Sequence, residues 1–329
     1  MSHATGDAGR SPAAAKAARI VQPAHPYRRR EPLPWCQPKP AEDDPDAPRR
    51  VAEILASPSY RQADQDVEFL NRNETRGPRL QLDYLKPELL LEQHEIAHTV
   101  VVFGSTRIAE PGAARRKAER LQQAVAAEPA NADLRRQLAC AERLRANSHY
   151  YEVARDLGRL VGRAGKGPQD CRVVVMTGGG PGVMEAANRG AHDVGAKSIG
   201  LNIHLPHEQY PNPYITPDLC FRFHYFALRK LHFLLRAKAL VAFPGGYGTL
   251  DELFETLTLV QTRTIQPVPI ILVGERYWRQ AINIDFLVEE GSIDAEDREL
   301  FWYAETAQEI WDGILQWHTV NGAPLFPPA

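Results

Sequence analysis

The chain has 329 residues, of which 43% are hydrophobic and 24% are charged, with a formal net charge of −2 at pH 7. That length fits one large α/β domain with appendages, or two small domains. The charge balance gives no reason to expect a nucleic-acid partner, and no apolar run is long enough to cross a membrane. Four widely separated cysteines without metal-ligand spacing, and an N-terminus without a signal pattern, predict reduced thiols in a cytoplasmic protein.

The N-terminal part of the chain divides into two segments. Residues 1–50 are rich in Ala, Pro, Arg and Asp, with few large apolar side chains, and such a segment buries too little surface to offset its ordering entropy. We therefore predict a disordered tail over residues 1–50. Residues 51–97 carry short helical patterns with leucines able to pack on a core, and we predict an N-terminal helical cap there.

The main domain is expected over residues 98–329. It begins with the apolar run Thr99–Phe103, which indicates a buried strand. Gly104 and Ser105 end this strand, and a turn of this kind after a first parallel strand often holds a ligand phosphate or ribose. Residues 110–148 follow as a helical insert, because apolar side chains recur there at helical spacing. We expect the insert to serve packing or oligomer contacts rather than chemistry.

A second strand is followed by a glycine-rich turn. The apolar run Cys171–Thr177 leads into residues 178–182 and then into a helix from Val183 to Val194. One glycine-rich turn is weak evidence for nucleotide binding, but several such turns at the carboxyl ends of strands in one sheet favour a ligand crevice. The candidate ligand-binding residues of this turn are Gly178, Gly179, Gly180 and Gly182.

The most informative stretch lies between Phe226 and Thr262. Its strand, Ala239–Phe243, is stopped by a glycine turn at residues 244–248, and a new helix opens there. The bare N–H groups of that helix start favour an anion such as phosphate. Because Asp251 and Glu252 would repel a phosphate bound against them, the pattern predicts a ligand with two ends: a phosphate on the turn, and a centre that develops positive charge near a carboxylate.

The remaining elements complete an α/β pattern. Strands alternate with helices, which predicts a doubly wound, mostly parallel sheet with helices on both faces. A proline-rich loop after the third strand carries Glu208, for which a surface role and a ligand contact are equally plausible from spacing alone. The further strands are expected at residues 198–203, 219–225 and 267–273, and the further helices at residues 275–289 and 305–317.

Three motifs taken together resemble the Lonely Guy (LOG) family of cytokinin-activating phosphoribohydrolases, many members of which carry the label lysine decarboxylase. The motifs are GGGPGVM at residues 178–184, LRK at residues 228–230 and PGGYGTLDE at residues 244–252. The resemblance extends from about Thr99 to Thr262. It implies a Rossmann-like fold, a homodimer or larger homo-oligomer, no cofactor, and hydrolysis of a nucleoside 5′-monophosphate such as AMP or a cytokinin riboside monophosphate. The N-terminal region, the helical insert and Phe226-Ala227, where many members have Met-His, depart from the family pattern.

The resemblance also implies roles for particular residues. Cleavage of an N-glycosidic bond passes through an oxocarbenium-like ribose, which a carboxylate aimed at the sugar stabilises. That role is assigned to Glu252, with Arg229 holding the glutamate or the ligand and countering negative charge. The substrate-binding candidates, from the resemblance and from the glycine turns, are Gly104, Ser105, Gly178, Gly179, Gly180, Gly182, Glu208, Lys230, Gly245, Gly246, Tyr247, Gly248, Thr249 and Thr258.

Other classes of function fit less well. A decarboxylase needs a cofactor lysine with supporting pyridoxal contacts, and Lys230 beside Arg229 shows no such setting. No His/Cys/Asp cluster has metal spacing, and no serine sits in a nucleophile elbow. A non-catalytic carrier of a nucleotide or of molybdenum cofactor is the alternative, although a carrier would not need both Arg229 and Glu252. These two residues also have a purely structural explanation, as a helix-start carboxylate and its ion-pair partner.

Overall fold

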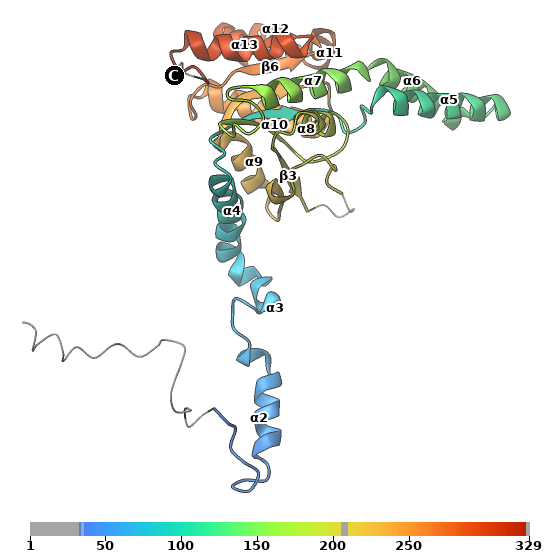
Figure 1. Cartoon of the computed structure of the whole chain (residues 1–329). Coiled ribbons are helices and arrows are strands. Elements are labelled where there is room, and N and C mark those ends of the chain that lie inside the picture. Colours follow the sequence, from blue (N-terminus) through green and yellow to red (C-terminus); the bar gives the residue numbers. More distant parts are fainter. Residues whose placement is uncertain (1–32, 34–35, 205–209, 327–329) are drawn as a thin grey trace, which may run out of the picture. The chain divides into compact units, whose positions relative to one another are not determined.

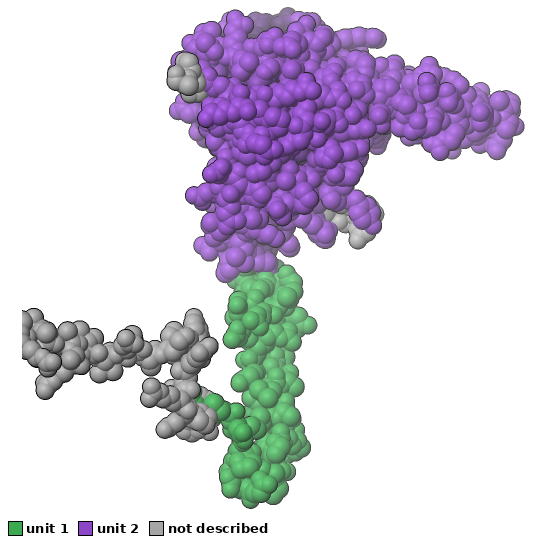
Figure 2. All heavy atoms as spheres, in the orientation of Figure 1, with its two compact units in different colours: residues 1–75 green, residues 76–329 purple. Residues whose placement is uncertain are grey.

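The computed structural model describes residues 33, 36–204 and 210–326. The chain divides into two compact units, residues 1–75 and residues 76–329 (Figure 2). The predicted tail lies mostly outside the described residues, the predicted cap over residues 51–97 falls partly in each unit, and both stay predictions. The helices described in the first unit are α2 (Ala47–Ala56), η1 (Pro58–Tyr60), α3 (Val67–Leu70) and η2 (Asn73–Thr75).

The second unit is built on a seven-stranded parallel sheet in the order β4-β3-β2-β1-β5-β6-β7. Most of its strands are short apolar runs, as expected where helices cover both faces. The doubly wound parallel sheet predicted from the sequence is therefore confirmed. The strands are β1 (His98–Phe103), β2 (Val173–Thr177), β3 (Ser198–Ile203), β4 (Cys220–Phe223), β5 (Ala237–Ala242), β6 (Ile270–Val273) and β7 (Trp302–Ala304).

Helices cover the sheet from both sides (Figure 1). The helices of the second unit outside the insert are α4 (Arg76–Gln93), α7 (His149–Arg163), α8 (Val183–Asp193), η3 (Pro217–Leu219), α9 (Phe226–Leu235), α10 (Tyr247–Gln261), α11 (Glu275–Ala281), α12 (Ile284–Glu289), η4 (Ala295–Leu300) and α13 (Ala307–Val320). Alternate residues of β1 enter two separate cores: Val100 and Val102 pack with α7, α8 and α13, whereas Val101 and Phe103 pack with α4, α9, α10 and α11.

The strand order reverses beside β1, which pairs with β2 on one side and with β5 on the other. The chain moves outward from β1 to β4 and then returns to add β5, β6 and β7. Helix α7, which follows β1 and the helical insert, and helix α10, which follows β5, belong to cores on opposite faces. The loops that leave β1 and β5 therefore diverge, and in sheets of this kind ligands bind in the crevice that such divergence opens.

The predicted insert is a pair of helices, α5 (Pro111–Ala127) and α6 (Ala132–Ala146). They lie side by side and extend away from the sheet (Figure 1). Small side chains allow the two helices to approach closely, since Ala114 and Ala118 of α5 and Ala141 of α6 are all buried.

The C-terminal part differs from the sequence prediction in two respects. The prediction of a single helix over residues 275–289 is wrong, because α11 ends before Ile282, which is extended and packs against the core. A new helix then starts at α12, where the Asn283 side chain accepts a hydrogen bond from the N–H of Phe286 at 3.0 Å. The sequence analysis also missed β7, a strand of three residues at the edge of the sheet.

Candidate functional site

A pocket of about 600 Å³ lies at the carboxyl ends of β1 and β5, where the strand order reverses. Its walls come from the loops after these two strands, from α8, α9, α10 and α11, and from the end of the insert. The pocket therefore occupies the crevice expected of a doubly wound sheet. The predicted site residues that line it are Gly104, Ser105, Arg229, Gly245, Gly246, Tyr247, Gly248, Thr249 and Glu252.

The glycine turn after β5 forms the start of α10. Gly246 is the N-cap residue, and the first N–H groups of the helix have no acceptor within the helix itself. A Cβ atom built at Gly246 or Gly248 would have no heavy atom within 4 Å, so the backbone at these two positions is directly accessible. Gly245 differs, because a Cβ atom there would lie 2.1 Å from the Thr249 hydroxyl oxygen. The turn is thus closely packed at Gly245, whereas at Gly246 and Gly248 it leaves room for an anion.

Glu252 lies one turn further along α10, with 5% of its surface exposed. Among the described residues, no hydrogen bond or ion pair engages its carboxylate. Burial raises the pKa of Glu252 to about 7, against the opposing effect of the nearby cations Lys230 and Arg229. A buried carboxyl with such a pKa, in a pocket and without a structural partner, is typical of a functional group rather than a structural one.

Arg229 reaches the same pocket from α9. Its Nε atom donates to the carbonyl oxygen of Leu201 at 2.7 Å, and its guanidinium lies over the rings of Phe226 and Phe233, with centroid distances of 5.6 and 5.0 Å. Burial lowers the pKa of Arg229, although the charges of nearby carboxylates oppose this effect. No ion pair joins Arg229 to Glu252 within the described part of the chain, so a direct structural pair does not explain the presence of these two residues.

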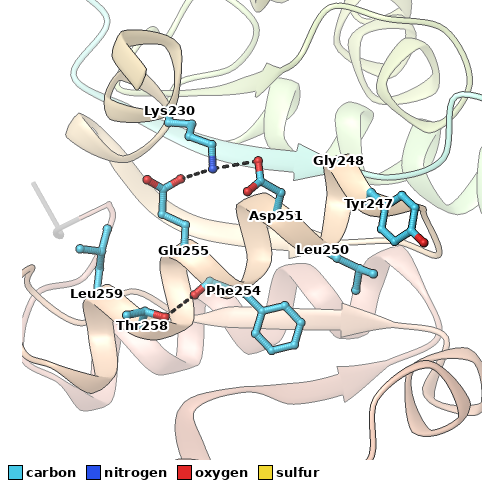
Figure 3. Close-up of a pocket in the computed structure, with 9 residues that line it drawn as sticks. All are labelled: Lys230, Tyr247, Gly248, Leu250, Asp251, Phe254, Glu255, Thr258 and Leu259. Atoms are coloured by element: carbon cyan, nitrogen blue, oxygen red, sulfur yellow. Dashed lines mark hydrogen bonds and ion pairs between the residues drawn. The ribbon is translucent and has the colours of Figure 1, made fainter. Parts of the chain in front are cut away.

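Lys230 and Thr258 do not line this pocket. They line a neighbouring outer groove of about 810 Å³ that runs along α10 and shares Tyr247 and Gly248 with the pocket (Figure 3). The Lys230 ammonium forms ion pairs with Asp251 at 2.8 Å and with Glu255 at 2.9 Å. The Thr258 hydroxyl donates back to the carbonyl oxygen of Phe254 at 2.7 Å.

The second glycine turn supports the site without lining it. None of residues 178–182, all of which the structure describes, lines the pocket or the outer groove. A Cβ atom at Gly178 would lie 2.6 Å from an Nη atom of Arg229, and one at Gly182 would lie 2.3 Å from the carbonyl oxygen of Ser105. Because Gly178 and Gly182 have no Cβ atom, Arg229 and the loop after β1 can lie directly against the backbone of this turn.

Buried amides hold the second glycine turn in place. The side chain of Asn212 donates to Asn188 Oδ1 at 2.9 Å and to the carbonyl oxygen of Gly180 at 3.2 Å, while its N–H donates to the carbonyl oxygen of Gly179 at 2.9 Å. Asn188 is fully buried and also bonds Thr177. Glu208, predicted to contact substrate, lies outside the described residues.

The sequence analysis missed several residues of the pocket. Tyr277 of α11 donates its hydroxyl to the carbonyl oxygen of Gly245 at 2.5 Å and so braces the glycine turn. Thr106 and Arg107 are the next two residues after the predicted Gly104-Ser105 turn, and this closeness in the sequence was the available signal. Nothing in the sequence alone points to Tyr277, or to the residues that the insert contributes. The missed lining residues are Phe103, Thr106, Arg107, Ile108, Leu144, Asn147, Met184, Pro244 and Tyr277.

The insert therefore does more than the sequence analysis expected of it. Leu144 at the end of α6 and Asn147, which caps that helix, both line the pocket. In the part of the chain that the structure describes, no group of three or more His, Cys, Asp or Glu residues is arranged to hold a metal ion, and no helix is long and apolar enough to cross a bilayer.

Fold and pocket together define a doubly wound α/β protein with an accessible helix start beside a buried carboxyl. Residues 184–314 match the protein family described as possible lysine decarboxylase. Over 169 residues the chain is 33% identical to the cytokinin riboside 5′-monophosphate phosphoribohydrolase LOG3 of Arabidopsis thaliana. The matched region covers 50% of this chain and 73% of that protein. The chain belongs to the LOG family, as its motifs indicated.

Two further comparisons concern a rice relative and a solved structure. A probable cytokinin riboside 5′-monophosphate phosphoribohydrolase of Oryza sativa subsp. japonica is 30% identical over 152 residues, covering 44% of this chain and 68% of that protein. The molybdenum cofactor binding protein of Rippkaea orientalis is 22% identical, with a TM-score of 0.37, and covers 51% of this chain and 87% of that one. A likeness at that TM-score has no bearing on function.

Proposed function

We propose that this protein hydrolyses the N-glycosidic bond of a nucleoside 5′-monophosphate, such as AMP or a cytokinin riboside monophosphate, and releases the free base and ribose 5-phosphate. One observation carries the proposal: a buried carboxyl without a structural partner, Glu252, lines the same pocket as the open helix start at residues 246–249. The two ends of such a substrate match these two features. The names of the relatives support the same reaction class.

The phosphate end of the substrate is assigned to the start of α10. Accessible N–H groups at Gly246 and Gly248 and the positive end of the helix dipole favour a dianionic phosphate there. The Thr249 hydroxyl lies within the same turn. Binding through backbone groups positions the ribose without placing a further charged side chain against the reacting carbon.

The reacting end of the substrate is assigned to Glu252. As the N-glycosidic bond breaks, its electron pair leaves with the base and positive charge grows on the ribose. An ionised carboxylate in a buried site stabilises that charge more strongly than water would. With a pKa of about 7, Glu252 is also suited to accept a proton from the attacking water, whose oxygen bonds to the anomeric carbon. Arg229 faces the pocket as a fixed cation and would counter charge on the departing base or on the phosphate.

Two further properties follow from family membership as proposals. We propose that the protein acts in the cytoplasm and assembles as a homodimer or larger homo-oligomer. Light scattering on the purified full chain measures the assembly directly.

The test of the reaction is release of free base from a panel of nucleoside 5′-monophosphates, with AMP first. We expect the wild type to release base, and we expect Glu252→Gln to lower kcat by about 10²- to 10⁴-fold, as loss of a positioned acid–base or charge-stabilising group does. Glu290→Gln is the matched control, because this exposed glutamate lies at the end of α12, away from the pocket. Absence of base release from every monophosphate, with intact ligand retained through purification, would contradict hydrolysis and support a carrier.

A further inference from the structure

Arg229 and Lys230 are adjacent on α9, and their cationic side chains point in different directions. Successive residues of a helix point about 100° apart, and the structure shows the consequence: Arg229 lines the pocket, whereas Lys230 lines the outer groove. In Figure 3 the Lys230 ammonium lies between the carboxylates of Asp251 and Glu255, one turn apart on α10. Only 16% of the Lys230 side chain is exposed, so this cation is held between the two carboxylates rather than directed at a ligand.

Three carboxyl groups crowd this part of α10. Asp251, Glu252 and Glu255 fall within five residues, and Glu252 is the buried member of the three. Among charged neighbours, Lys230 and Arg229 favour the ionised form of Glu252, whereas Asp251 and Glu255 disfavour it. The other titratable side chains on the pocket wall that Glu252 faces are Arg107, from the loop after β1, Tyr247, from the start of α10, and Tyr277, from α11.

We propose that Lys230 is a positioning residue that neutralises Asp251 and Glu255, so that the buried Glu252 carboxyl can carry the negative charge that the reaction uses. Lys230 therefore acts through Glu252 and does not contact the substrate, in contrast to the substrate contact that the family resemblance implied. The inference rests on the proposed function for its kinetic meaning, but the ion pairs that join Lys230 to Asp251 and Glu255 do not depend on that function.

Loss of the Lys230 charge would break both of its ion pairs. Asp251 and Glu255 would then present two uncompensated negative charges beside Glu252, and a like charge nearby disfavours ionisation of a carboxyl. Because the ionised form of Glu252 is the reactive one, the acid limb of the pH–rate profile should move to higher pH. Removal of the two flanking carboxylates together with the lysine should move the limb back.

The experiment compares the pH dependence of kcat/KM for AMP among variants of the full chain. We expect Lys230→Met to move the acid limb upward by about one pH unit, as expected for exposing a carboxyl to nearby like charges. Lys230→Arg should restore the wild-type limb. The triple variant Lys230→Met, Asp251→Asn, Glu255→Gln should return most of the way to the wild type, a rescue that a merely structural lysine would not show. Lys117→Met, on the exposed surface of α5, is the matched control.

A substrate-contact role gives a different result. If Lys230→Met raises KM for AMP with an unmoved acid limb, and the triple variant shows no rescue, the positioning role is wrong. A second readout separates this inference from the reaction itself: ¹³C NMR titration of the glutamate carboxyls, with the Glu252 signal identified by its loss in Glu252→Gln. If the wild type cleaves no monophosphate, the proposed function fails, while the NMR midpoint still decides the inference: an upward move in Lys230→Met supports it and an unmoved midpoint overturns it.

Discussion

Replacing Glu252 by glutamine should stabilise the protein at alkaline pH while removing its activity. Glutamine has nearly the shape of a protonated glutamate but never ionises, so it removes the cost of a buried charge. In the folded protein, burial raises the pKa of Glu252 from 4.5 to about 7. At about 1.4 kcal/mol for each tenfold change in an ionisation constant, this shift corresponds to about 3 kcal/mol.

The sign of the effect follows from proton binding. Because the pKa of Glu252 is higher in the folded state, the folded protein binds more protons than the unfolded chain between about pH 4.5 and pH 7. The free energy of unfolding of the wild type therefore decreases as the pH rises through this window, and the full cost is present above it. Glu252→Gln lacks this dependence, so its advantage should be near zero at pH 4.5 and about 3 kcal/mol at pH 8.5.

Urea unfolding of the full chain at these two pH values measures the difference. Glu255→Gln is the control from the same helix, because Glu255 is ion-paired with Lys230 and its replacement should not stabilise the protein at either pH. If Glu252→Gln has the same free energy of unfolding as the wild type at pH 8.5, or a lower one, then burial does not destabilise the ionised Glu252 carboxylate in the folded protein. The assignment of a pKa near 7 would then be wrong.

Two further predictions concern the glycine turns. Gly178→Ala places a methyl group 2.6 Å from an Nη atom of Arg229. The variant should lower kcat/KM by about 100-fold, which is the effect of displacing a group in a site by about one ångström. An unchanged kcat/KM would show that this turn does not influence catalysis. Gly245→Ala places a methyl group 2.1 Å from the Thr249 hydroxyl and should lower the melting temperature. Gly246→Ala meets no protein atom within 4 Å, so it should leave the melting temperature unchanged and raise KM for the monophosphate alone; equal melting temperatures for the last two variants would refute this distinction.

The sequence by itself determined the architecture. Buried strands such as β1 and β5 are apolar runs stopped by glycine, and this local pattern is sufficient to indicate a parallel sheet covered on both faces. The glycine turn and its helix are also local, since residues 244–252 are contiguous in the chain. For this reason the sequence placed a candidate phosphate site and a candidate carboxylate next to each other. Together with the motifs at residues 178–184 and 228–230, the same turn indicated the LOG family.

Only the tertiary structure decided which of the candidates share a pocket. Arg229 and Lys230 are adjacent in the sequence, yet helix geometry turns one into the pocket and the other into the outer groove. Tyr277 is 32 residues from Gly245 and reaches its carbonyl oxygen only because α11 and α10 both pack into the core on the same face of the sheet. Asn147 joins the pocket because the insert returns to the sheet before α7 begins. Such meetings depend on helix register and on packing between distant segments, and neither is recorded in a local pattern of residues.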